Sequence, residues 1–370
     1  MPNVSIVKCS SYDKARVYAA IKKVIDDIGF RIKPGSKVIL KPNVLNGSRP
    51  NDAVTTHPSV VEAVCRVLRE KDCSIIIAES SGFTSTLKNY EVCGIAEVAR
   101  RYDAKLVSLS SESIITKRIE GAKVLKETKV SKILFEADLI INLPKLKTHT
   151  LTKYTGAVKN LFGCIPGVLK QKYHVKAPSE KRFCNLIVDI YSLIMPELNI
   201  MDGIVGMEGD GPSGGDPKKI GLVIAADDAA ALDLVVEKMI GLEGKVYTTR
   251  FAIARRLLDP DKVNVSGEIK KIRFRHAGAN SSRVPAIISE LIFRYSVPEP
   301  HVIKERCVRC GACAKVCYSK AIRLNPYPVF NRRRCIHCFC CHELCPYHTI
   351  GLKKKPFIEF LSKLKHKVLG

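Results

Sequence analysis

Two runs of cysteine near the end of the chain have the spacing of iron–sulfur ligands. They are Cys307, Cys310, Cys313 and Cys317, then Cys335, Cys338, Cys341 and Cys345. Within each run the first three thiolates can reach three irons of one cubane, while the fourth points away and ligates the cluster of the other run. The spacing therefore predicts two 4Fe–4S clusters, which transfer single electrons.

The exchange of fourth ligands divides these thiolates into two sets. The first cluster is assigned Cys307, Cys310, Cys313 and Cys345, and the second is assigned Cys335, Cys338, Cys341 and Cys317. Cys340 lies in the same segment, and the spacing leaves it without a cluster. A pair of zinc sites is the alternative, but zinc modules usually place two CxxC pairs about a dozen or more residues apart.

A second concentration of polar residues occupies the stretch LPKLKTHTLTKYTGAVKNLFGCIPG, directly after the apolar run DLIIN. Lysines supply positive charge and asparagine supplies a neutral donor and acceptor, which together suit a carboxylate or a phosphate. Small residues let a ligand approach the backbone closely. We predict substrate-binding roles for Lys145, Lys147, Thr155, Gly156 and Asn160. Lys159 and His149 are predicted to be catalytic, with His149 as an acid or base.

Similar residues follow other apolar runs. Lys41 and Asn43 end the run KVILK, and Glu79 follows the run SIIIA. The glycine-rich stretch that begins at Asp202 contains Gly211 but matches neither a P-loop nor a dinucleotide fingerprint. We predict that Lys41, Asn43 and Gly211 bind substrate and that Glu79 is catalytic. Glu79 or Asp202 is expected to bind a metal or share a proton.

The elements that must position these residues are apolar strands alternating with helical patterns, up to about residue 245. Continuous apolar runs favour a parallel sheet covered on both faces, with ligands beyond the carboxyl ends of its strands. We predict a doubly wound, mostly parallel α/β sheet, followed by a small α+β ferredoxin-like domain. We also expect one helix at 90–101, a smaller lobe built from 263–266 and 272–274, and a closing helix at 285–295.

The polar joint SVPEPH separates two parts of the chain. We predict an α/β domain at 1–295, a linker at 296–302, a dicluster ferredoxin domain at 303–352 and a basic amphipathic tail helix at 353–370. Within the first domain, Asp228 is predicted to be a helix N-cap. Asp233 stands in an apolar helical pattern and is expected to be exposed or to pair with a lysine.

Charge and hydropathy limit the classes of partner. The formal net charge is +25, and residues 301–370 hold fifteen Lys+Arg against three Asp+Glu. Such a field attracts an acidic redox partner protein or a small anionic substrate. Nucleic-acid binding lacks a supporting motif, and contact of the tail with a membrane surface is a weaker alternative to its packing on the protein. A secretory signal and a transmembrane run of ~18 apolar residues are not recognisable, which favours a cytoplasmic protein.

Several of these motifs together resemble a known family. KPN, LPKLKTH, TGAVKNLFG, DGIVGMEGDGP and ALD (231–233) are similar to the domain-of-unknown-function 362 family. In that family the domain is often fused to a dicluster ferredoxin module, as here. The resemblance covers residues 1–290 and the ferredoxin segment. It implies this architecture and a redox link, but no substrate.

Two hypotheses of function follow. In the first, the chain is a redox enzyme whose clusters relay electrons to an anionic substrate in the lysine-rich cleft. In the second, it is an electron carrier or adaptor whose α/β domain is a docking module. Loss of substrate-dependent cluster reoxidation in a lysine variant distinguishes the first from the second.

Overall fold

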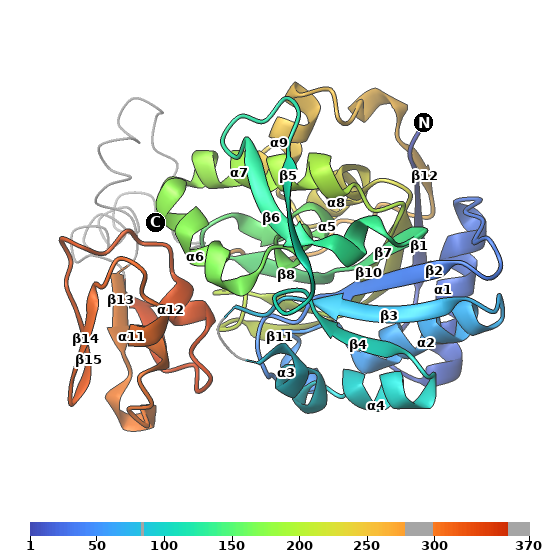
Figure 1. Cartoon of the computed structure of the whole chain (residues 1–370). Helices are drawn as coiled ribbons and strands as arrows, with labels where there is room; N and C mark the ends of the chain where they lie inside the picture. Colours follow the sequence, from blue (N-terminus) through green and yellow to red (C-terminus); the bar gives the residue numbers. More distant parts are fainter. Residues whose placement is uncertain (83–84, 278–298, 354–370) are drawn as a thin grey trace, which may run out of the picture.

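A computed structural model describes residues 1–82, 85–277 and 299–353 (Figure 1). Its centre is one large sheet, whose main path runs in the order β12 (Asn264–Ser266), β1 (Asn3–Lys8), β11 (Asp216–Ala226), β10 (Leu198–Glu208), β7 (Leu139–Leu143), β2 (Lys37–Pro42), β3 (Ser74–Glu79) and β4 (Lys105–Ser108). The strands from β10 to β4 are parallel to their neighbours, while β11 is antiparallel to both β1 and β10. The predicted fold class, a mostly parallel α/β sheet, is confirmed.

Two short strands extend the sheet beside the carboxyl end of β7. β8 (Lys145–His149) pairs with β10 and also with β9 (Lys153–Thr155). A separate hairpin is formed by β5 (Ile114–Arg118) and β6 (Glu127–Ser131). Because β8 follows β7 after a single proline, the predicted Lys145 and Lys147 lie on a strand at the sheet edge where β7 ends.

Helices cover both faces of the sheet, each over its own hydrophobic core. One face carries α1 (Lys14–Asp27), α2 (Pro58–Arg69), α3 (Thr86–Val92) and α4 (Ile95–Arg101). The other carries α5 (Ala157–Asn160), α6 (Gly167–Lys176), α7 (Glu180–Ile194), α8 (Ala229–Met239) and α9 (Tyr247–Ala254). Short 3₁₀ turns connect several of these elements: η1 (Pro50–Asp52), η2 (Lys132–Phe135), η3 (Leu161–Cys164) and η4 (Pro260–Lys262).

Local sequence explains where helices start and stop. The Asp228 side chain accepts a hydrogen bond from the Ala231 N–H, so its predicted role as the N-cap of α8 is confirmed. The single helix expected at 90–101 is wrong, because Gly94 adopts φ +78° and divides the segment into α3 and α4.

The smaller lobe expected at 263–274 is also wrong. Residues 264–266 form β12, which pairs in parallel with β1 at the edge of the main sheet, and 272–274 form no strand. The predicted helix at 285–295 and the predicted tail helix lie outside the described residues, apart from residue 353 at the end of a strand. Within the described ranges, no helix has the length and apolar character needed to cross a membrane.

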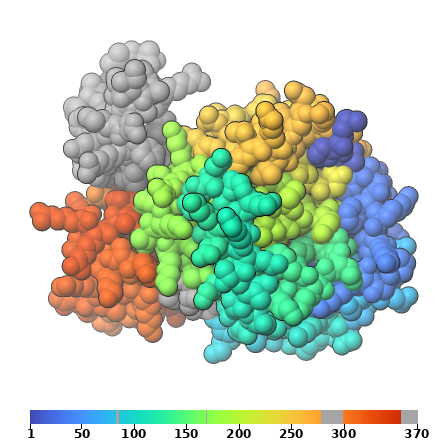
Figure 2. Space-filling model, turned by 45° about the horizontal axis from the view of Figure 1, so that its top comes forward, coloured from blue at the N-terminus to red at the C-terminus, as the bar shows by residue number. Residues whose placement is uncertain are grey.

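The cysteine-rich part folds as a small unit of its own elements (orange in Figures 1 and 2). These are β13 (Glu299–Val302) paired with β16 (Ile350–Lys353), the hairpin β14 (Ile322–Asn325) and β15 (Tyr327–Phe330), α11 (Ala312–Val316), α12 (Cys340–Glu343) and the 3₁₀ turn η5 (Lys304–Arg306). Cys313, Cys345, Ile322 and Ile350 form its small core. In Figure 2 this unit lies against the yellow-green part of the α/β region.

Candidate functional site

A cavity of about 90 Å³ lies between the sheet and the cysteine-rich unit. It opens beyond the carboxyl ends of β2 and β3, the edge at which parallel sheets bind ligands. Six residues that the sequence predicted line it: Asn43, Glu79, Lys147, Thr155, Lys159 and Asn160. Lys170, His174, Cys340, Glu343 and Leu344 also line it and were not among the predicted site residues.

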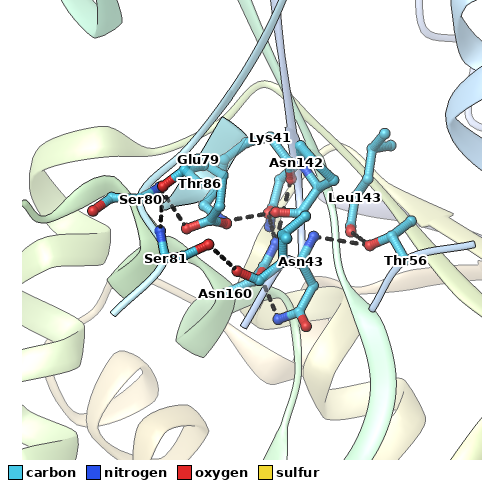
Figure 3. Close-up of polar contacts among 12 residues, drawn as sticks. Lys41, Asn43, Thr56, Glu79, Ser80, Ser81, Thr86, Asn142, Leu143 and Asn160 are labelled. Carbon is cyan, nitrogen blue, oxygen red and sulfur yellow. Dashed lines mark hydrogen bonds and ion pairs between the residues drawn. The ribbon is translucent and has the colours of Figure 1, made fainter. Parts of the chain in front are cut away.

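The two predicted asparagines form a buried amide network (Figure 3). Asn43 Nδ2 donates to Asn160 Oδ1 at 2.8 Å, and Asn160 Nδ2 donates to Asn142 Oδ1 at 2.7 Å. Lys147 Nζ donates to Asn43 Oδ1 at 2.9 Å and to the carbonyl of Val54 at 2.7 Å. The network fixes the ammonium of Lys147 at the cavity without giving it a carboxylate partner. Burial and the neighbouring ammonium of Lys159 hold the pKa of Lys147 well below its usual value.

Glu79 is held by a buried ion pair with Lys41, as Figure 3 shows. Its other carboxylate oxygen accepts the Ser80 N–H at 2.8 Å. A side chain at Gly163 would collide with this pair, so only glycine lets the α5–η3 segment approach so closely. Lys41 itself does not line the cavity, and its ammonium serves to fix Glu79.

Lys159 differs from the other cavity lysines because its ammonium makes no hydrogen bond or ion pair with any described residue. Burial lowers its pKa, while the Glu343 carboxylate and the Cys340 thiol oppose that shift. Lys170, on α6, donates to the Ser80 carbonyl and lies 4.0 Å from the Glu79 carboxylate. Burial lowers the pKa of Lys170 to about 8. The cavity therefore holds three lysines against two carboxylates, and Lys159 is the lysine without a partner among the described residues.

The structure places the predicted His149 behind the cavity wall, 1 % exposed and not among the lining residues. Its Nδ1 accepts the N–H groups of Leu151 at 3.0 Å and Thr152 at 3.3 Å, so its Nε2 carries the ring proton. That Nε2 lies 3.2 Å from Glu343 Oε1. Burial and the ammonium of Lys159 hold the pKa of His149 well below 6.5, which keeps the ring neutral. His149 thus reaches the cavity only through Glu343.

His174, one turn after Lys170 on α6, is the histidine that lines the cavity. Its ring stacks on Phe183 with centroids 4.3 Å apart and meets the edge of Phe162 at 5.7 Å. Neither ring nitrogen has a hydrogen-bond partner among the described residues. Burial, reinforced by Lys159 and Lys170, lowers its pKa to about 3, so the imidazole is neutral.

The structure does not bring Lys145 to the cavity. Its ammonium donates to Asp202 Oδ2 at 2.7 Å and to Tyr12 at 2.8 Å, and Tyr12 donates to the other Asp202 oxygen at 2.9 Å. Lys145 and Asp202 are fully buried. The ring of Tyr12 stacks on His57 with centroids 3.5 Å apart. These contacts form a separate buried network that fastens β8 to β10.

Gly156 and Gly211 also lie outside the cavity lining, at tight backbone contacts. Gly211 packs on the backbone of Thr148, and a side chain at Gly156 would collide with Asp233. Asp233 is 1 % exposed and accepts the N–H groups of Ala157 at 2.7 Å and Val158 at 3.0 Å. The expectation that Asp233 is exposed or pairs with a lysine is therefore wrong. It caps α5, the turn that carries Lys159 and Asn160.

The cysteine thiols gather in two groups. Burial and the thiols of Cys345, Cys310 and Cys307 raise the pKa of Cys313 to about 11. Burial and a second group of thiols, led by Cys338, Cys335 and Cys317, raise the pKa of Cys341 well above its usual value. These are the two ligand sets that the spacing predicts, and thiolate sulfur is the ligand of a 4Fe–4S cubane, so the chemistry of the residues suits that cofactor. Among the described residues, no three His, Cys, Asp or Glu side chains are placed to hold a single metal ion.

Cys340 lines the cavity and also lies against the second cysteine group, since its thiol interacts with that of Cys338. It begins α12, and Glu343 and Leu344 at the end of that helix line the same wall. The Glu343 carbonyl accepts the Ser213 hydroxyl at 3.0 Å, which fastens α12 to the α/β region. Among the nine cysteines of this unit, Cys310 is the exposed one. The first cysteine group therefore has one exposed member, and the second adjoins the cavity through Cys340.

Comparisons with known proteins add two family matches. A family described as a domain of unknown function (DUF362) matches residues 38–237, and the 4Fe-4S binding domain family matches residues 300–323. The chain is 34 % identical over 262 residues to the thylakoid-associated protein sll1697 of Synechocystis sp., covering 70 % of this chain and 80 % of that protein.

One solved structure with some likeness is the lactate racemase apoprotein of Thermoanaerobacterium thermosaccharolyticum. The identity is 13 %, and the TM-score is 0.37. The likeness covers 60 % of this chain and 53 % of that one, so the chain spans about half the length of this solved protein.

Proposed function

We propose a redox-enzyme function for this chain, which belongs to the DUF362 family and is an iron–sulfur protein with at least one 4Fe–4S cluster. In the proposal it carries two 4Fe–4S clusters and transfers their electrons to an anionic substrate bound in the cavity. Cys307, Cys310, Cys313 and Cys345 hold one cluster, and Cys335, Cys338, Cys341 and Cys317 hold the other.

The observation that carries the proposal is the shared wall. α12 supplies Cys340 and Glu343 to the cavity, and the proposed ligand Cys341 follows Cys340 directly in that helix. The second cysteine group is therefore separated from a bound molecule only by the helix that carries it. A module that served only a diffusing partner would not need to form the wall of an internal cavity.

The residues of the cavity have distinct tasks in this proposal. Lys159 pairs with the anionic group of the substrate, because its ammonium has no other partner. Lys147, held by the amide network of Asn43 and Asn160, adds a hydrogen-bond donor. Glu79 pairs with Lys41 and is placed to orient a donor group of the substrate.

The protein also needs a source of electrons, and we propose an acidic one-electron carrier protein. The outward-facing Cys310 follows Arg309, whose guanidinium lies 5.8 Å from the ring centroid of Tyr327. Lys304 lies at the same distance from that ring. A basic surface beside a cluster steers an acidic partner, and the attraction weakens with salt. We propose a cytoplasmic location. The alternative is association with a membrane, since the Synechocystis relative is named a thylakoid-associated protein.

Anaerobic purification followed by iron and sulfide analysis tests the cofactor content. Two cubanes require about eight iron and eight sulfide per chain, whereas about four of each would leave one cluster. Mass spectrometry of small molecules that co-purify identifies candidate substrates. Addition of such a molecule should reoxidise the reduced clusters in the wild type but not in Lys159→Met. Equal reoxidation in both would favour the electron carrier over the enzyme.

A further inference from the structure

We infer that the cavity is a subsite for a small oxyanion of about four non-hydrogen atoms, bound between the Lys159 ammonium and the His174 imidazole. The inference rests on the proposed function for its place in the protein and adds the class of ligand. Short carboxylates and inorganic oxyanions share the required chemistry, which is a compact group with one negative charge spread over two or three oxygens.

The size of the cavity sets the size of the ligand. An apolar cavity of about 150 Å³ accommodates benzene, which has six non-hydrogen atoms. In proportion, about 90 Å³ accommodates three or four. This is the size of acetate or nitrate. A larger substrate would place only its anionic end in this space.

The negative charge expected of the ligand follows from the environment of Lys159. Lys159 is half-buried, and an anion that enters the cavity can pair with its ammonium. Lys147 and Lys170 obtain acceptors from the protein, whereas the ammonium of Lys159 obtains none among the described residues. Glu343 contributes attraction from beyond ion-pair distance. An oxyanion oxygen would complete the coordination of this ammonium.

His174 supplies the second contact. Stacking on Phe183 and the edge of Phe162 fixes the plane of its ring, although no hydrogen bond to a described residue does so. The side chain is 7 % exposed and lines the cavity. A neutral imidazole carries one N–H donor, which can reach a second oxygen of the anion. The unpartnered hydroxyl of Thr155 lies in the same lining.

The test measures binding of acetate and nitrate to the full-length protein, purified anaerobically with its clusters oxidised. Isothermal titration should show saturable binding of acetate, of nitrate or of both. Lys159→Met should weaken it by roughly tenfold or more, because a charged hydrogen bond is lost. His174→Phe should weaken it less. Butyrate should bind no more tightly than acetate, because only its carboxylate occupies this space.

Lys153→Met is the matched control, because Lys153 pairs with Glu180 and lies outside the cavity lining. Binding that is unchanged in Lys159→Met, that falls equally in Lys153→Met, or that chloride reproduces would overturn the inference. Lys159→Gln replaces Lys159→Met if iron content shows that the latter misfolds. A preference for acetate assigns the site to carboxylates, and equal affinity assigns it to planar oxyanions generally.

The test separates this inference from the proposed function because no electron is transferred in it. Anion binding without any effect on cluster reduction would keep the subsite and refute the relay. Absence of anion binding, with Lys159-dependent reoxidation by a neutral molecule, would keep the relay and refute the subsite.

Discussion

Asp233 is predicted to be the residue that holds Lys159 in position without touching the cavity. Its carboxylate accepts the N–H groups of Ala157 and Val158 and the hydroxyl of Tyr154 at 3.2 Å. α5 spans only Ala157–Asn160, so these bonds hold half of its residues. Replacing Asp233 with alanine should leave α5 uncapped and displace Lys159.

The cost of Asp233→Ala can be worked from the three donors that lose their acceptor. Each buried donor left without a partner costs about 1–3 kcal/mol. Near the lower end of that range, three donors give a loss of about 3–5 kcal/mol in the free energy of unfolding. Asp233→Asn keeps one acceptor oxygen and should lose about 1–3 kcal/mol. Urea unfolding measures both losses, and isothermal titration with acetate should show weaker binding in both variants.

Asp189 provides a matched control. It is also fully buried, and it accepts the N–H groups of Lys123, Val124 and Leu125 at 2.8–2.9 Å, but it lies outside the cavity lining. Asp189 also pairs with Arg255 at 2.6 Å, so Asp189→Ala should destabilise the protein at least as much as Asp233→Ala, while acetate binding stays near the wild-type value. If both variants weaken acetate binding equally, or if Asp233→Ala leaves it unchanged, the positioning role of Asp233 is refuted.

Three further predictions concern protonation and cofactor ligation. The pKa of His174 is about 3 in the folded protein and about 6.5 in the unfolded chain. Between these pH values the unfolded chain binds one proton more, so the free energy of unfolding falls as the pH drops from 6.5 to 3. His174→Phe should reduce this fall, measured by urea unfolding, by up to about 1.4 kcal/mol per pH unit. Burial lowers the pKa of Lys170 from 10.5 to about 8, which costs about 3 kcal/mol of folding stability below pH 8. The free energy of unfolding should therefore rise between pH 8 and 10.5. Lys170→Met should be more stable than the wild type at pH 7 and should lack this rise. Cys340→Ser should keep the wild-type iron and sulfide content, whereas Cys341→Ser should lose iron; the reverse pattern would show that Cys340 is the ligand.

The spacing of residues in the sequence predicted those features of the fold and the site that depend on a short segment of the chain. The cysteine runs predicted an iron–sulfur protein, because a cubane draws three ligands from one loop. Continuous apolar runs indicated a mostly parallel sheet, and strand ends at Asn43 and Glu79 indicated the edge where the cavity lies. These features need only local sequence and the general geometry of parallel sheets.

Other features depend on contacts between distant segments. Lys145 and Lys147 stand in the same sequence motif and were given the same predicted role. Lys145 instead pairs with Asp202, fifty-seven residues away. His174 reaches the cavity because its ring packs against Phe162 and Phe183. No local sequence pattern predicts this packing. The four-residue spacing of Lys170 and His174 was the available signal, since it places both on one face of a helix.

The glycine-rich stretch after Asp202 illustrates a further limit. A glycine-rich stretch is typical of a loop, yet residues up to Glu208 continue β10, which pairs with β11 over most of its length. Gly203 and Gly206 approach backbone atoms of Leu222 and Leu146 where a side chain would be crowded. Here glycine permits close strand packing rather than a turn.

The most direct test of the central claim is an electron paramagnetic resonance titration of the reduced clusters with acetate, in the wild type, Lys159→Met and Lys153→Met. If the second cysteine group forms one wall of the anion site, acetate should change the signal of one cluster in the wild type and in Lys153→Met. Lys159→Met should show no change at the same acetate concentration. Signals that are insensitive to acetate in all three proteins, while titration shows that acetate binds, would contradict the coupling of the clusters to the cavity.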